Sequence, residues 1–197
     1  MNHKENLISD YIERSIQTKK ELRKTNIEVI AQIVELIIDA YRQGKKVVWF
    51  GNGGSAADAQ HLACELVSKF FLERKALASF ALTTNTSELT AIANDYDFSR
   101  VFARQVEALV NPGDIVIGIS TSGSSPNVIE GIKEAKHLGA ITIAFTGASG
   151  GKLKGIADFL LDVPSEITPH IQESHIMIGH IICYLVEKEL FGDKNEK

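Results

Sequence analysis

The sequence is poor in the residues that mark unusual classes of protein. Its 197 residues include two cysteines and four prolines, which excludes a disulfide-framed miniprotein and a collagen-like repeat. A basic excess is also missing, because 21 Lys and Arg stand against 25 Asp and Glu, for a net charge of −4. A general nucleic-acid binder needs positive charge to displace counterions from phosphates, so we expect no nucleic-acid partner.

Long apolar segments are missing as well. No run approaches the roughly 18 residues that a membrane-spanning helix requires, and the first six residues lack the apolar core of a signal peptide. Cys64 and Cys183 lie in apolar stretches without metal-finger spacing, which predicts reduced thiols. We therefore expect a mildly acidic cytoplasmic protein of one domain, without a membrane partner.

What the chain contains is a helical start followed by alternating strands and helices. Residues 7–43 carry apolar side chains at helical spacing in two segments, separated by a polar break at residues 24–26. Five short apolar runs then alternate with helical patterns, at residues 47–50, 78–82, 115–119, 141–145 and 159–163. Such runs predict a doubly wound α/β fold, flavodoxin-like or Rossmann-like, with a five-stranded parallel sheet and an N-terminal helical extension.

The two N-terminal helices allow two interpretations. Their apolar stripes can cover the sheet of their own chain, or they can be buried against another subunit, as in homo-oligomers. Helices placed outside a complete sheet have little left to cover, so the pattern favours an oligomer.

Glycines follow the first predicted strand, in residues 51–55 (Gly-Asn-Gly-Gly-Ser). They let the backbone approach a ligand closely, and the next helix offers free N–H groups and the positive end of its dipole. The segment formally satisfies a dinucleotide fingerprint, but the second strand ends in residues 83–85 (Thr-Thr-Asn) without the acidic residue that holds a ribose. A ligand loop and a tight turn without a ligand both stay open.

Hydroxyl groups crowd the loop after the third predicted strand. Residues 120–125 (Ser-Thr-Ser-Gly-Ser-Ser) place five hydroxyls around one glycine, just before Pro126 begins a helix. Hydroxyls and N–H groups at a helix N-terminus bind phosphate without a lysine. Such turns also occur as helix caps, but one cap needs only one hydroxyl. The loop therefore favours phosphate binding.

Imidazole and carboxylate groups occur together on two predicted helices. His61 and Glu65 are four residues apart and project from one helical face. The last helix carries further candidates, namely Gln172, Glu173, His175 and His180. These groups suit a zinc or similar divalent site, or acid–base chemistry, and they also occur as plain surface pairs. Spacing alone does not choose among the residues of the last helix.

Together these motifs resemble those of bacterial phosphoheptose isomerases, which belong to the sugar isomerase (SIS) superfamily. The resemblance covers essentially the whole chain and rests on residues 51–61, Glu65, residues 94–95, residues 118–123, and residues 171–173 with His180. It implies a single SIS domain over residues 1–197, with a helical extension over 1–44, an α/β core over 45–191 and a tail over 192–197.

The resemblance also implies an activity and its site. Family members convert sedoheptulose 7-phosphate to D-glycero-D-manno-heptose 7-phosphate for surface glycans such as lipopolysaccharide. They are cytoplasmic homotetramers with sites between subunits, and many bind zinc, expected here as one ion per subunit. By position, the sugar contacts are Asn52, Gly53, Gly54, Asn94 and Asp95. The phosphate contacts are Ser120, Thr121, Ser122 and Ser125. The metal ligands are His61, Glu65, Gln172 and His180, of which Glu65 and Gln172 also touch the substrate.

Three positions depart from the family pattern, which usually has arginine where this chain has Lys69 and His170, and often glycine where it has Ser68. Lysine keeps the charge but lacks the bidentate fork of arginine, and histidine can be neutral. These changes bear on the orientation of the sugar chain and of the start of the last helix, and so on the identity of the substrate more than on the type of reaction.

Ketose–aldose isomerisation moves a proton between C1 and C2 through an enediol, which needs a base at carbon and an acid at the oxygens. We predict Glu65 as the base and His180 as the acid–base partner. A carboxylate that ligates zinc is a weaker base, so the two roles of Glu65 compete.

The competing hypothesis is a non-catalytic SIS-domain binding protein that resembles the DnaA initiator-associating protein. Such a protein lacks the full catalytic set, so the combination of residues favours the isomerase. A sugar-phosphate sensor or another aldose–ketose isomerase shares the site and is separable only by assay.

Overall fold

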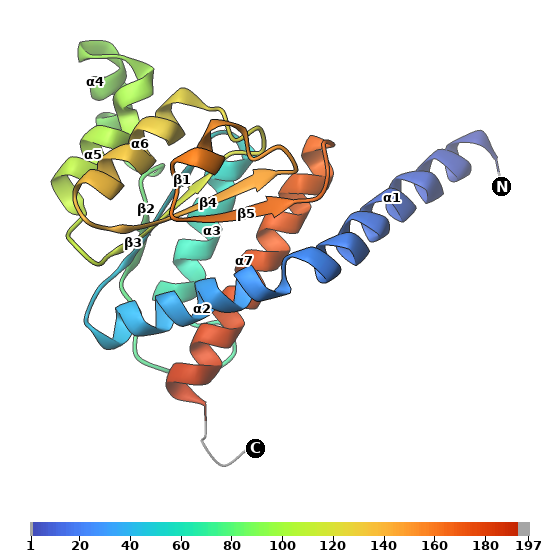
Figure 1. Cartoon of the computed structure of the whole chain (residues 1–197), viewed down its shortest axis with the longest axis horizontal. Helices are drawn as coiled ribbons and strands as arrows, with labels where there is room; N and C mark the ends of the chain where they lie inside the picture. Colours follow the sequence, from blue (N-terminus) through green and yellow to red (C-terminus); the bar gives the residue numbers. More distant parts are fainter. Residues whose placement is uncertain (1, 193–197) are drawn as a thin grey trace.

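A five-stranded parallel sheet lies at the centre of the protein, in a computed structural model that describes residues 2–192 (Figure 1). Its strands are β1 (Val47–Gly51), β2 (Ser79–Ala81), β3 (Ile115–Ile119), β4 (Ile141–Gly147) and β5 (Phe159–Val163). Every neighbouring pair in the sheet is parallel. The predicted α/β fold and its five strands are confirmed.

The order of the strands positions the candidate site. The sheet runs β2-β1-β3-β4-β5, so the chain moves outward from β1 to β2 and then returns to the other side of β1 to form β3. β1 and β3 pair along their full length, from Val47 opposite Ile115 to Gly51 opposite Ile119. The loops that leave these two strands therefore diverge at the point where strand order reverses, which is the usual ligand crevice of an open α/β sheet.

Helices cover both faces of the sheet, because strand side chains alternate between two apolar clusters. Trp49, Ile117 and Phe145 face one cluster, which is shared with α2 (Ile27–Arg42), α3 (Gly54–Val67) and α7 (Thr168–Phe191). Val48 and Phe50 face the other cluster, shared with α5 (Val101–Leu109) and α6 (Pro126–His137). The remaining elements are α1 (His3–Thr25), α4 (Thr86–Asp95), and the 3-10 turns η1 (Phe98–Arg100) and η2 (Gly151–Gly155).

The first helix projects away from the body of the molecule (Figure 1). It starts at His3, earlier than its apolar pattern, because Asn2 and Glu5 form a capping box. Thr18 and Leu22 are its buried residues, whereas its apolar stripe is exposed, at Leu7, Ile8, Tyr11, Ile12 and Ile16. The interpretation that both N-terminal helices cover the sheet is therefore wrong for α1, although α2 does cover it.

The sequence pattern predicts a helix from the glycine-rich segment to about residue 71, but α3 ends at Val67. The physical reason lies on α7, where the buried Glu187 carboxylate accepts hydrogen bonds from the N–H groups of Phe70, Phe71 and Leu72. These N–H groups would otherwise bond within a helix. The segment after α3 is therefore held in an irregular path against α7.

Three further expectations concern the chain as a whole. Cys64 and Cys183 are free thiols, as predicted, with Cys183 buried. Within the described chain, every helix falls short of the length or the apolarity that crossing a membrane requires. Of the predicted tail, residues 193–197 lie outside the described residues.

Candidate active site

The glycine-rich segment is built for close backbone approach. Gly53 has φ +56°, in the left-handed region that favours glycine, and α3 begins directly after it. At Gly51, a Cβ atom would lie 2.8 Å from the carbonyl oxygen of Ile119, so the end of β1 leaves no room for a side chain beside the end of β3. In the first turn of α3 the N–H groups of Ser55 and Ala56 donate to the carbonyl oxygens of Asn52 and Gly53, so the glycine-rich segment is closed into a tight turn.

The hydroxyls of the loop after β3 converge. The Ser120 Oγ lies 3.0 Å from the Ser125 Oγ and 3.5 Å from the Ser122 Oγ, and these three predicted phosphate contacts stand before the first turn of α6. The backbone carbonyl of Thr121, the fourth, accepts a hydrogen bond from the N–H of Gly147, the last residue of β4. The loop is thus braced by the end of the neighbouring strand, and its hydroxyls and N–H groups can surround a phosphate.

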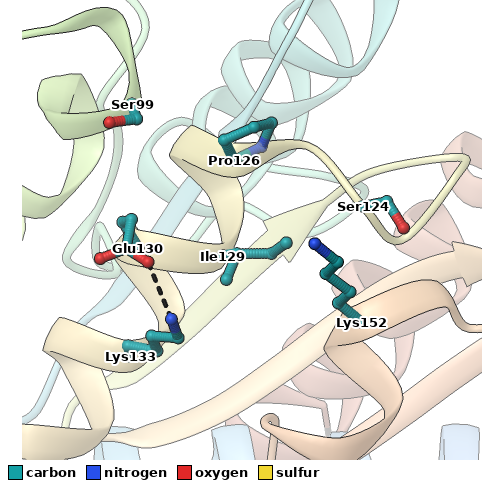
Figure 2. A pocket seen from close by; sticks show the side chains of 7 residues that line it. All are labelled: Ser99, Ser124, Pro126, Ile129, Glu130, Lys133 and Lys152. Atoms are coloured by element: carbon teal, nitrogen blue, oxygen red, sulfur yellow. Dashed lines mark hydrogen bonds and ion pairs between the residues drawn. The ribbon is translucent and has the colours of Figure 1, made fainter.

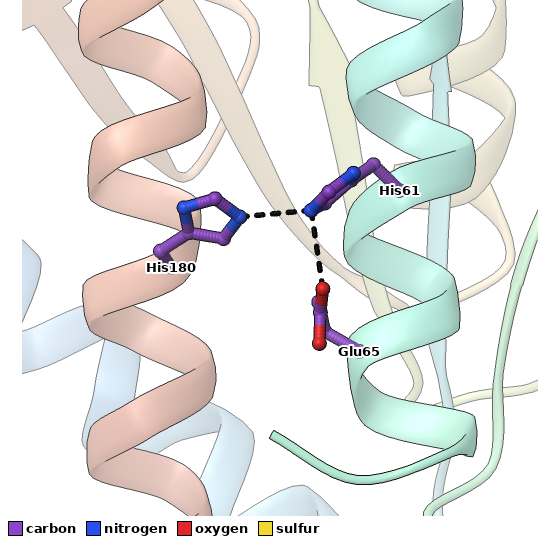
Figure 3. Close-up of side chains that lie close together, drawn as sticks. All are labelled: His61, Glu65 and His180. Atoms are coloured by element: carbon purple, nitrogen blue, oxygen red, sulfur yellow. Dashed lines mark hydrogen bonds and ion pairs between the residues drawn. The ribbon is translucent and has the colours of Figure 1, made fainter. Parts of the chain in front are cut away.

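Three of the four predicted metal ligands meet between α3 and α7 (Figure 3). The Nε2 atoms of His61 and His180 are 2.9 Å apart, and His61 Nε2 is 3.1 Å from a carboxylate oxygen of Glu65. One ligand atom from each residue lies within 4.8 Å of the others. Two imidazoles and a carboxylate this close together are a donor set that suits zinc, and the residues also suit proton transfer.

The candidates on the last helix separate into four environments, which spacing alone does not predict. His180 faces His61, whereas Glu173 faces α1, where it pairs with Lys19 at 2.9 Å and accepts a hydrogen bond from Ser15. His175 is fully buried, with Nε2 3.0 Å from the carbonyl oxygen of Thr146, and burial lowers its pKa to about 4. Glu173 and His175 are therefore structural residues of this fold.

Gln172, the fourth predicted ligand, lies at the other end of α3. A Cβ atom on Gly54 would be 1.8 Å from its Nε2, so the Gln172 carboxamide occupies the space that this glycine leaves open. It is eight residues before His180, which is about 12 Å along a helix. In a single chain Gln172 thus stands beside the glycine-rich segment, a position that suits its predicted contact with the substrate.

The other predicted sugar contacts, Asn94 and Asp95, lie at the exposed end of α4. The Asn94 amide donates a hydrogen bond of 2.8 Å to the Asp95 carboxylate. α4 packs against α5 and η1, away from α7 (Figure 1). Within one chain the structure does not bring these two residues to the imidazole cluster, which consists of His61, Glu65 and His180.

The structure shows what surrounds His170 and Lys69, the two positions where the family usually has arginine. His170 is buried, packs against Tyr11 at a centroid distance of 4.6 Å with the ring planes tilted by 54°, and lies 3.2 Å from the Glu173 carboxylate. Lys69 is exposed in the segment after α3 and pairs with Glu73 at 2.8 Å. His170 therefore joins α1 to α7, and Lys69 lies on the surface.

Sequence reasoning missed two residues near the site. Asp58 lies one turn before His61 on α3, and burial raises its pKa to about 6 against the opposing effect of His61. Asn127 lies in the first turn of α6 and contacts Asn52 across the crevice. No motif names Asn127, because its partner is 75 residues away in the chain.

A cavity of about 290 Å³ lies on the outer side of α6 (Figure 2). It is lined by Ser99, Ser124, Pro126, Ile129, Glu130, Lys133 and Lys152, among which Lys133 and Glu130 form an ion pair. Of the hydroxyl loop, residues 120–125, only Ser124 lines this cavity. None of the predicted sugar or phosphate contacts lines it. This cavity is therefore separate from the crevice between β1 and β3.

Comparison with known proteins agrees with this geometry. The family model of the SIS domain matches residues 10–147. The phosphoheptose isomerase of Clostridium acetobutylicum is 56% identical over 191 residues, which cover 96% of this chain and 97% of that protein. The chain belongs to the phosphoheptose isomerase family. Within the family, the enzyme of Sulfurimonas denitrificans is 50% identical over 94% of this chain and 96% of its own length.

Solved structures of the same family share the fold. The phosphoheptose isomerase of Francisella tularensis superposes with a TM-score of 0.92 at 39% identity, and covers 95% of this chain and all of its own. That of Neisseria gonorrhoeae has a TM-score of 0.89 at 43% identity, over 93% of this chain and 98% of its own. Family membership favours the isomerase prediction over the non-catalytic binding protein.

Proposed function

We propose that this protein isomerises sedoheptulose 7-phosphate to D-glycero-D-manno-heptose 7-phosphate. The observation that carries the proposal is the meeting of His61, Glu65 and His180, since the last of these comes from a helix 119 residues away in the chain. The carboxylate and the two imidazoles are the groups that an isomerase needs as base and acid, and an assay of turnover separates this function from that of a sugar-phosphate sensor. The family membership gives the substrate.

In this proposal Glu65 removes the proton from the carbon next to the carbonyl, and His180 exchanges a proton with the sugar oxygens. A positioned base of this kind contributes about 10²–10⁴-fold to the rate. Ser120, Thr121, Ser122 and Ser125 hold the phosphate, and Asn52, Gly53 and Gly54 line the sugar. Gln172 supports this arrangement from its position over Gly54. Asn94 and Asp95 reach the substrate from a second subunit.

The donor set also fits a metal ion. His61, Glu65 and His180 would hold zinc, one ion per subunit, with Gln172 as a fourth ligand contributed in the assembly. Zinc would supply Lewis acidity toward the sugar carbonyl or orient its ligands. The grouping of one ligand atom each from His61, Glu65 and His180 within 4.8 Å of one another supports this assignment.

The proposed assembly is a homotetramer. Its support is the apolar stripe of α1, of which Leu7, Ile8 and Ile12 are more than half exposed. A second exposed apolar group surrounds the imidazole cluster and includes Phe71 and Tyr184, whose rings are 5.8 Å apart. Burial of both surfaces between subunits would complete the site. We place the enzyme in the cytoplasm, where its product would enter the synthesis of surface heptoses such as those of lipopolysaccharide.

The test is an assay in which the purified full chain is incubated with sedoheptulose 7-phosphate and the appearance of the aldose product is measured. Glu65→Gln and His180→Gln should each lower kcat by about 10²–10⁴-fold, because each removes a proton-transferring group. Bound zinc, measured by elemental analysis, should fall in His180→Gln. Inorganic phosphate should still bind both variants.

The matched controls are Glu35→Gln and His137→Gln, since both residues are exposed and lie on α2 and α6, outside the two helices that carry the cluster. They should retain the activity of the unmodified chain. An unmodified chain without turnover would remove the proposed reaction, and near-normal turnover in either test variant would remove that residue from the mechanism.

A further inference from the structure

Two asparagines form a reciprocal pair across the crevice between the β1 and β3 loops. The Asn52 Nδ2 donates to the Asn127 Oδ1 at 2.8 Å, and the Asn127 Nδ2 donates to the Asn52 Oδ1 at 2.8 Å. Asn52 follows β1, whereas Asn127 lies in the first turn of α6, directly after the hydroxyl loop. The pair therefore links the segment predicted to hold the sugar to the loop predicted to hold the phosphate.

The orientation of both amides is determined by the backbone. The N–H of Val128 donates to the Asn127 Oδ1 at 3.0 Å, so this atom must be the oxygen of the Asn127 side chain. The Asn127 Nδ2 then faces Asn52, so the Asn52 atom that accepts this hydrogen bond must be Oδ1. The pair uses one N–H and one lone pair of Asn52, and leaves one donor and one acceptor of that amide for a ligand.

Asn127 itself is in no position to contact a sugar. Its exposed fraction is 2%, whereas Asn52 is half-buried at the edge of the crevice. A buried amide that satisfies its hydrogen bonds with another side chain is held firmly, because leaving either group unpaired costs free energy. Asn127 thus acts on the crevice through Asn52.

We propose that Asn127 is a positioning residue for the isomerisation, which fixes the rotamer of Asn52 and the spacing between the sugar and phosphate subsites. This inference rests on the proposed function. A phosphate anchored at one end of a seven-carbon chain leaves the reacting carbons at the other end, so the relative position of the two loops determines where those carbons lie. Small displacements of such groups cost about 10²-fold in rate.

The experiment is a double-mutant cycle on the full-length protein, with Asn52→Ala, Asn127→Ala and both together. Asn127→Ala should lower kcat/KM about 10- to 100-fold with a raised KM for the sugar phosphate. Inhibition by inorganic phosphate should stay within about twofold, because the serine hydroxyls are unchanged. The double variant should be no worse than Asn52→Ala alone, since Asn127 acts only through that amide.

Asn127→Ser repeats the measurement with a short polar side chain, in case alanine impairs folding, and thermal unfolding is recorded for every variant. The matched control is Asn111→Ala, the same change at an exposed position before β3, which should be silent. Independent, multiplying losses in the double variant, or full activity in Asn127→Ala and Asn127→Ser, would overturn the proposal. Those outcomes presuppose an active unmodified chain, so they are distinct from failure of the proposed reaction.

Discussion

At the scale of single residues, Gly123 is the most constrained position of the hydroxyl loop. Its φ is +62°, and a Cβ atom there would lie 2.1 Å from the carbonyl oxygen of Gly150. Gly123→Ala should therefore displace the loop and weaken inhibition by inorganic phosphate. A non-glycine residue at positive φ costs about 1–2 kcal/mol, which lowers Tm by roughly 2–8 °C in a chain of this size.

The matched control for this change is Gly155→Ala. Gly155 has an ordinary φ and no atom within 4 Å of the position that its Cβ would take. It should leave phosphate inhibition and Tm unchanged. Equal phosphate inhibition in Gly123→Ala and the unmodified chain would show that the loop does not depend on its glycine.

Residue by residue, the site was predictable where the chemistry is local or where a motif carries it. His61 and Glu65 share a helical face because they are four residues apart, and the structure pairs them. The part of α3 that Gln172 and His180 each face was not predictable, since it depends on how α7 lies along α3. The contact between Asn52 and Asn127 likewise exists only once two loops meet at the sheet.

At the scale of elements, one buried ion pair joins the end of α3 to α7. The Arg74 and Glu187 side chains lie 2.9 Å apart and are 1% and 2% exposed. Arg74 also donates to the carbonyl oxygens of Glu65 and Leu66 in the last turns of α3. Through these bonds the pair fixes the turn of α3 that carries the predicted base.

Glu187→Gln should destabilise the protein by about 3–5 kcal/mol, because it leaves Arg74 buried without its counter-charge. Burial alone would raise the pKa of Glu187, but three backbone N–H groups and Arg74 outweigh it and lower the pKa. The carboxylate therefore stabilises the fold fully above the unfolded glutamate pKa of about 4.3, and this contribution is lost as the pH falls through the lower folded-state pKa.

Urea unfolding at several pH values checks this prediction. The difference in unfolding free energy between Glu187→Gln and the unmodified chain should be largest at neutral pH and should narrow in acid below the ordinary glutamate range. Glu73→Gln is the control, because Glu73 pairs with Lys69 in solvent and should matter little. A difference that is small at neutral pH would contradict the assignment.

The elements themselves were predictable, but several of their ends were not. Apolar runs located all five strands, because buried parallel strands are continuous in hydrophobicity. The end of α3 depends on Glu187, which is more than 110 residues away from the N–H groups it binds. No local pattern contains that information. The start of α1 was in principle readable from its capping box, since Asn2 and Glu5 are neighbours in sequence.

At the scale of the whole molecule, the exposed stripe of α1 is the feature that supports the proposed assembly. Its apolar stripe is exposed in the single chain and packs on neither face of the sheet. We expect light scattering to give the mass of four chains. Ile12→Glu places a charge in the middle of this stripe, where Ile12 is 53% exposed, and should shift the mass to smaller species.

The control is Asn6→Glu, which introduces the same side chain at an exposed position on the opposite face of α1. It should leave the mass unchanged. A monomeric unmodified chain, or an Ile12→Glu variant with the full mass, would show that the stripe serves another purpose. Because Asn94 and Asp95 lie away from the imidazole cluster in one chain, loss of assembly should also lower turnover.

Fold class was predictable from the alternation of strands and helices, whereas the order of the strands was not, since it depends on which edge each helix returns to.

The length of chain between His61 and His180 affects the stage of synthesis at which the imidazole pair can form. All five strands precede His180 in the chain. A chain whose synthesis stops before this residue therefore contains every strand and His61 but lacks the second imidazole of the pair. In the proposed mechanism, synthesis has to pass the middle of α7 before a copy can become active.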